Sequence, residues 1–110
     1  MSEIIEQLYY SDRGLFFVFS IVIEKSAREY LGKMQKKTRR ILVDKILELQ
    51  YNPYPGGNKE RLDYPHPPVV YRLHVSRSFT VFSIIKEDER TIRVEKIMTI
   101  EQAHKEYRRR

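Results

Sequence analysis

The chain has 110 residues, enough for one domain with a single modest hydrophobic core. It contains no cysteine, which excludes disulfides, thiolate zinc sites and a cysteine nucleophile. The formal net charge is +6, and the basic residues are concentrated: residues 25–50 carry eight basic and three acidic residues, whereas residues 1–24 carry one arginine and four acids. Either a polyanion partner or a helix with a solvated, charged outer face would explain that basic segment.

The N-terminal part divides into a polar and an apolar stretch. We expect residues 1–13 to form a short helix or an extension lying on the domain, and residues 14–110 to form the domain itself. Residues 15–23 are the one continuous apolar run, too short to span a membrane, and the acidic residues before them do not match a signal peptide. We therefore predict a strand there and no membrane contact. The absence of cysteine suits the cytoplasm.

Two amphipathic helices are predicted next. In residues 25–34, Ser26 and Glu29 have the spacing of a capping box, and apolar residues follow at helical intervals. The second helix is predicted over residues 38–50. It ends before Asn52, because a residue that precedes proline is disfavoured in the α conformation.

The second half of the chain predicts a loop and a sheet. Residues 53–68 hold all five prolines and a glycine pair, which favours a loop. Strands are predicted over residues 69–75, 79–85 and 91–100, followed by a short C-terminal helix or tail. The expected class is α+β: an N-terminal strand, a helical hairpin and an antiparallel three-strand meander in one curved sheet, with the hairpin covering one face.

The strand at residues 69–75 carries the first candidate site. Because side chains alternate along a strand, Val70, Arg72 and His74 share one face, opposite an apolar-to-aromatic face that contains Leu73. On the last strand the same alternation would place Arg93 and Lys96 on opposite faces. Three scattered histidines have no metal-site spacing, so neither a metal nor another cofactor is expected.

In its order of elements and in several short segments, the chain resembles the RelE/ParE superfamily of toxins from type II toxin–antitoxin systems. The resemblance covers about residues 16–107, and residues 1–13 look like an extension that the family usually lacks. The segments that carry it are residues 25–31, Asn52 with Pro53, Leu62, and residues 71–75, 79–82 and 103–107.

The resemblance implies a curved sheet with a basic groove on its open side. RelE-like members are mRNA interferases: endoribonucleases that cut messenger RNA, usually on the ribosome, by metal-independent attack of a 2′-hydroxyl on the adjacent phosphate, and so inhibit translation. The implied partners are a cognate antitoxin protein, mRNA and the ribosome with its 16S rRNA, with a heterotetramer as one assembly. The alternatives are a ParE-like inhibitor of DNA gyrase and a catalytically weak homologue that binds only RNA or antitoxin.

By the same resemblance, Arg72 would hold the scissile phosphate and His74 would orient or transfer a proton. His104 and Tyr107 match the terminal region where family nucleases keep a catalytic or base-stacking tyrosine. The structural alternatives are an ordinary solvent-facing strand pair and a frayed basic tail. The basic residues expected to contact RNA are Arg77, Lys36, Lys37, Arg39, Arg40, Arg108 and Arg109.

Two positions depart from the family pattern. Thr80 and Glu101 stand where RelE-like ribonucleases often have arginines. Arg77 would have to substitute for the first of these across the turn. Glu101 is more simply explained as a helix-start carboxylate stabilised by the helix dipole. These departures put the catalytic strength in doubt and leave the expected fold unchanged.

Overall fold

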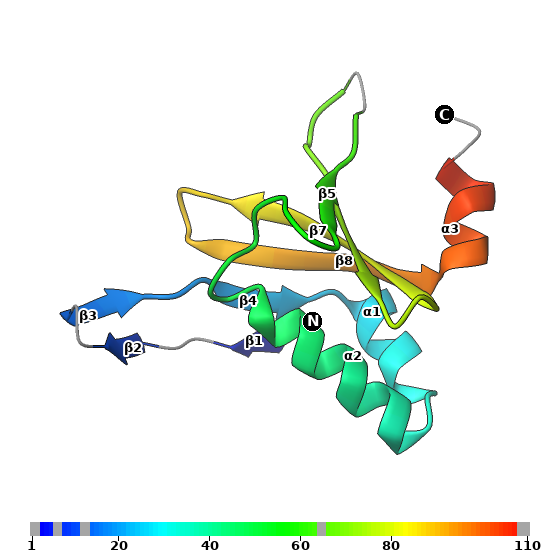
Figure 1. Ribbon diagram of the computed structural model, residues 1–110, viewed down its shortest axis with the longest axis horizontal. Helices are drawn as coiled ribbons and strands as arrows, with labels where there is room; N and C mark the ends of the chain where they lie inside the picture. Colours follow the sequence, from blue (N-terminus) through cyan, green and yellow to red (C-terminus); the bar gives the residue numbers. More distant parts are fainter. Residues whose placement is uncertain (1–2, 6–7, 12–13, 64–65, 108–110) are drawn as a thin grey trace.

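The computed structural model describes the backbone of residues 3–5, 8–11, 14–63 and 66–107, and side chains from residue 18 to 106 within these ranges. A sheet with strand order β1-β4-β8-β7-β6-β5 forms its centre, and a separate hairpin pairs β2 with β3 (Figure 1). The strands are β1 (Glu3–Ile5), β2 (Leu8–Ser11), β3 (Gly14–Phe17), β4 (Ser20–Ile23), β5 (Lys59–Arg61), β6 (Tyr71–Val75), β7 (Phe79–Lys86) and β8 (Thr91–Thr99). The helices are α1 (Lys25–Gly32), α2 (Lys36–Glu48) and α3 (Ile100–Tyr107).

The mixed α+β class and the meander are confirmed, since β6, β7 and β8 pair in sequence as antiparallel neighbours. The predicted strand over residues 15–23 instead divides into β3 and β4. Phe19 lies between them and is 3% exposed, and its amide donates to the carbonyl of Gln50 at 3.0 Å. From Ser20 the chain pairs in parallel with β8. The apolar run of residues 15–23 is therefore interrupted where the chain leaves the hairpin with β2 and buries Phe19.

Other boundaries also differ from the predictions. The N-terminal residues that the structure describes are strands, not a helix, because β1 pairs with β4 and β2 with β3. The predicted loop contains β5, which pairs with β6. The predicted capping box does not form: the N-cap of α1 is Glu24, without a side-chain cap bond, and the hydroxyl of Ser26 donates to the carbonyl of Glu95 at 3.2 Å. Tertiary contacts with β8 thus set the start of α1.

The helical hairpin covers one face of the sheet, as predicted. In Figure 1, α2 runs below the strands while α3 rises above them. Leu42 and Ile46 of α2 are fully buried and pack in one cluster with Leu73 and Val75 of β6. Burying such side chains contributes about 1.5–3 kcal/mol each. None of the described helices is long and apolar enough to cross a membrane.

We call the opposite side of the sheet the open face; it carries Arg72 and His74, and α3 packs on one end of it through Ala103 against Phe82 and Met98. A β-bulge interrupts the pairing of β7 with β8: Phe82 pairs with Lys96, but Ser83 pairs with Val94.

The extra residue in β8 shifts the alternation by one position. Arg93 and Lys96 therefore lie opposite Ile84 and Phe82, two residues of one face of β7. The prediction that Arg93 and Lys96 occupy opposite faces was wrong, because alternation alone does not reveal a bulge.

Candidate nucleic-acid site

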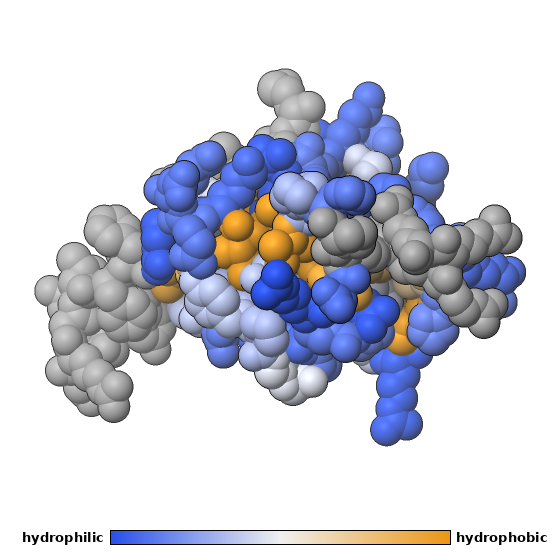
Figure 2. All heavy atoms as spheres, turned by 90° about the horizontal axis from the view of Figure 1, so that it is seen from above, coloured by the Kyte–Doolittle hydropathy of each residue, from blue (hydrophilic) through white to orange (hydrophobic). Residues whose placement is uncertain are grey.

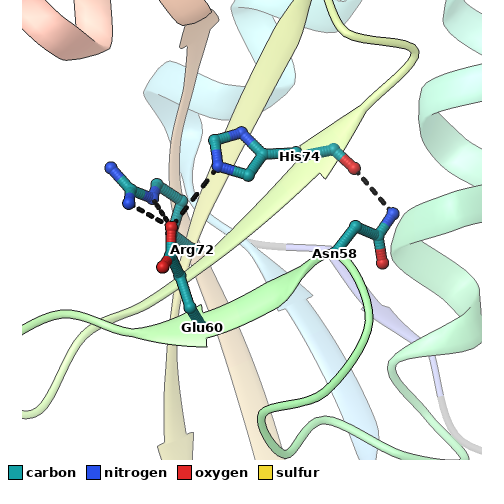
Figure 3. Close-up of polar contacts among 4 residues, drawn as sticks. All are labelled: Asn58, Glu60, Arg72 and His74. Atoms are coloured by element: carbon teal, nitrogen blue, oxygen red, sulfur yellow. Dashed lines mark hydrogen bonds and ion pairs between the residues drawn. The ribbon is translucent and has the colours of Figure 1, made fainter.

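Arg72 and His74 converge on a third residue, Glu60, which sequence reasoning missed (Figure 3). The register of β5 and β6 places Glu60 directly opposite Arg72. The Nε atom of Arg72 donates to Oε1 of Glu60 at 2.7 Å, and its Nη2 atom binds the same oxygen. His74 Nε2 lies 3.5 Å from that oxygen. One carboxylate oxygen therefore joins the two residues predicted to carry the chemistry.

Backbone contacts around a tight turn position Glu60. Gly57 has a φ of 60°, which glycine adopts without steric strain, and Gly56 and Lys59 bond to each other across the turn. Asn58 then binds the backbone of His74 twice: the His74 amide donates to the Asn58 carbonyl at 3.0 Å, and Asn58 Nδ2 donates to the His74 carbonyl at 2.8 Å. These bonds fix β5 against β6, so Glu60 faces Arg72.

The positive charge of Arg72 affects the ionisation of the Glu60 carboxyl. The hydrogen bond from Arg72 lowers the pKa of the Glu60 carboxyl, and the opposing effect of burial is smaller. Glu60 is therefore ionised near neutral pH and suits the orientation of an imidazole. Since Nε2 of His74 faces the carboxylate, Nδ1 is the nitrogen left to accept a proton.

Two polar atoms near this point have no partner. His74 Nδ1 and Thr80 Oγ1 are both buried and find no hydrogen bond among the described residues. The two residues pair across β6 and β7, and Thr80 pairs on its other side with Met98. Thr80 is fully buried, so the position where RelE-like ribonucleases often have arginine lies in a packed environment. A buried polar group without a partner costs about 1–3 kcal/mol.

The other predicted residues do not gather at this site in the described part of the chain. Arg77 lies exposed in the turn between β6 and β7, with a φ of 56°, and forms no ion pair or hydrogen bond there with Glu60, Arg72 or His74. His104 is exposed on α3. The side chain of Tyr107, and Arg108 and Arg109 entirely, lie outside the described residues.

The basic segment of α2 lies on the other side of the sheet. Lys36, Lys37 and Arg40 are exposed and form no ion pair within the described residues. Arg39 differs, because it donates to the carbonyls of Leu31 and Met34, each at 2.9 Å, and so binds the residues that end α1 and follow it. The predicted cluster thus contains three solvated cations and one that holds the helical hairpin together.

Three cations on the open face are paired with carboxylates. Besides Arg72 with Glu60, Arg93 pairs with Glu24 at 3.2 Å, and Lys96 pairs with Glu106 of α3 at 3.3 Å. The three solvated cations of α2, by contrast, have no such partner among the described residues.

Apolar side chains gather near the middle of the face seen from above in Figure 2, with polar residues around them. On the open face of the sheet, Leu62 and Val70 pack against buried Phe82 and Met98. An apolar floor beside a cation and an imidazole fits an unstacked nucleobase with its phosphate.

A groove of about 610 Å³ lies between α1 and α3 along the end of β8, and none of the predicted site residues lines it. Among the described residues, no three His, Asp or Glu side chains gather as a metal site.

No protein-family model matches the sequence, and no curated protein sequence is significantly similar to it. The fold does match a solved structure, the archaeal RelE–RelB complex from Pyrococcus horikoshii OT3, with a TM-score of 0.64 and 18% sequence identity. The match covers 74% of this chain and 94% of that chain. At this identity the likeness shows the fold alone: the protein has a RelE-like fold.

Proposed function

We propose that this protein is the toxin of a type II toxin–antitoxin pair, a RelE-like endoribonuclease that cleaves mRNA on the ribosome in the cytoplasm. The RelE-like fold supports the toxin class. The observation that carries the reaction is the convergence of Arg72 and His74 on Glu60, beside an apolar floor. In this proposal residues 14–110 are the toxin domain and residues 1–13 an extension of it.

The proposed reaction needs no metal. The imidazole of His74, which Glu60 holds in place in the free protein, accepts the proton of a 2′-hydroxyl, and the freed oxygen attacks the adjacent phosphorus. Arg72 stabilises the negative charge that develops on the phosphate oxygens. The bond to the 5′ oxygen breaks, leaving a 2′,3′-cyclic phosphate and a 5′-hydroxyl once that oxygen is protonated. His104 and Tyr107 are the proposed source of this proton and of stacking on a base.

The proposed partners follow from the same class. The matched protein was solved with RelB, and we propose a corresponding antitoxin for this chain, with a heterotetramer as the assembly. The proposed RNA contacts are Arg77, Lys36, Lys37, Arg39, Arg40, Arg108 and Arg109. The unpaired cations of α2 suit the backbone of 16S rRNA, because phosphate contacts depend on charge more than on sequence.

One observation favours a second candidate function. His74 Nδ1 and Thr80 are both buried, so the free protein does not present the proposed base to solvent. This arrangement favours a homologue that binds RNA or antitoxin with weak cleavage. Apo geometry tightens in many enzymes when substrate binds, so we rank cleavage first.

The test is inducible expression with mapping of mRNA 5′ ends. Wild-type protein is expected to stop translation and to create new 5′ ends, and Arg72→Ala with His74→Ala to abolish both. His66→Ala, an exposed histidine in the loop, and Lys45→Ala, whose lysine pairs with Glu48 on α2, are matched controls that retain cleavage. Growth arrest with intact message contradicts the nuclease, and DNA breaks would instead identify a gyrase inhibitor.

A further inference from the structure

Two different groups would bind the guanidinium of Arg72. In the proposed function it holds a phosphate, yet in the free protein two of its nitrogens bind Oε1 of Glu60. Carboxylate and phosphate oxygens accept the same forked pattern of guanidinium hydrogen bonds. The carboxylate of Glu60 therefore stands where a phosphate oxygen of an RNA substrate would bind.

The same oxygen also faces the imidazole. His74 Nε2 lies 3.5 Å from Oε1 of Glu60, so one carboxylate holds both groups of the proposed reaction. Whatever removes it from Arg72 also removes it from His74. Displacement of Glu60 would therefore free Arg72 and His74 together.

Glu60 is placed so that it can leave. Its side chain is 49% exposed, and β5 is the last strand of the sheet, so rotation toward solvent disturbs no core packing. Arg72, by contrast, is 22% exposed and lies on an inner strand. The carboxylate is therefore the member of the pair that can rotate away without disturbing the sheet.

We propose that Glu60 is an internal competitor of the RNA phosphate: it occupies Arg72 in the free protein and must be displaced for substrate to bind. This inference rests on the proposed function, because it takes RNA as the ligand of Arg72. It assigns to Glu60 an inhibitory contact that lowers the affinity for RNA, and it confines the orientation of His74 by Glu60 to the free protein.

Binding, separated from cleavage, tests the inference. The probe is a short 2′-O-methyl RNA, which lacks the attacking hydroxyl, titrated against the purified full-length chain. Glu60→Gln and Glu60→Ala are expected to bind it about three- to tenfold more tightly than wild type, the range expected when a partly exposed charge pair no longer competes. Glu106→Gln is the matched control: it removes the same charge, from the pair with Lys96.

The contribution of Arg72 is isolated by a double-mutant cycle. In an Arg72→Ala background, Glu60→Gln is expected to increase the affinity for the probe no more than Glu106→Gln does. Without the Arg72 guanidinium, Glu60 and the RNA phosphate no longer compete for the same group. Suppose that, in the wild-type background, Glu60→Gln increases the affinity for the probe no more than Glu106→Gln does, while Arg72→Ala still weakens binding. The role of Glu60 as a competitor is then overturned, and the proposed function stands. If Arg72→Ala leaves probe binding unchanged, both fail.

Discussion

The Nε atom of Arg39 donates a hydrogen bond of 2.9 Å to the carbonyl oxygen of Leu31, joining α2 to the end of α1. The last carbonyls of a helix have no partner within it, and a guanidinium is a strong donor to them. Arg39→Ala is therefore expected to reduce the free energy of unfolding by about 1.5–3 kcal/mol, the range for bonds to charged groups. Exposed Arg40→Ala should change it by less than about 0.5 kcal/mol in the same urea titration.

Salt dependence tests the basic surface of α2. Replacing Lys36, Lys37 and Arg40 together by glutamine removes three unpaired cations, so the slope of log affinity for single-stranded RNA against log salt should fall by about 2. Lys45→Gln, whose lysine pairs with Glu48 at 3.5 Å, should leave the slope nearly unchanged. An unaltered slope in the triple variant would show that RNA does not contact this surface.

The buried hydroxyl of Thr80 offers a test of packing. Thr80→Val removes a polar atom that has no partner among the described residues and keeps the shape of the side chain. We expect a thermal midpoint equal to or above that of wild type, with a gain of up to about 1 kcal/mol. Thr80→Arg, which introduces the residue that RelE-like ribonucleases often have at this position, should unfold the domain instead because position 80 is fully buried. Marked destabilisation by valine would reveal a hidden partner of the hydroxyl.

The lowered pKa of Glu60 predicts a pH effect on stability. Because Arg72 lowers the folded-state pKa of this carboxyl, its ion pair stabilises the fold above the unfolded value of about 4.3 and is lost as pH falls through the folded value. The stability difference between wild type and Glu60→Gln should be constant near neutral pH and shrink below about pH 4. The effect should be small, because Glu60 is half exposed. A difference that grows in acid would contradict this assignment.

Local patterns predicted the parts of the fold that depend on local sequence. Helical periodicity marked α1 and α2, and alternation placed Arg72 and His74 on one face of β6. The sequence could not reveal β5, because three charged or polar residues carry no apolar alternation and are a strand only through pairing with β6.

The same limit applies to the site. Glu60 reaches Arg72 through the register of two strands whose connection passes through a proline-rich loop, and no spacing in the sequence encodes that register. The bulge at Glu95 likewise arises from pairing with β7, so the shared face of Arg93 and Lys96 could be found only in three dimensions.

The parallel pairing of β4 with β8 has a consequence for biosynthesis. Ser20 to Ile23 pair in parallel with Thr91 to Val94, which lie far along the sequence. Contacts between such distant segments form late, because a long loop must close before they are made. Until β8 has been synthesised, the sheet therefore lacks a central strand, and Arg72 and His74 have no completed sheet beneath them. A nascent chain of this topology therefore completes the candidate site only after β8 has been made.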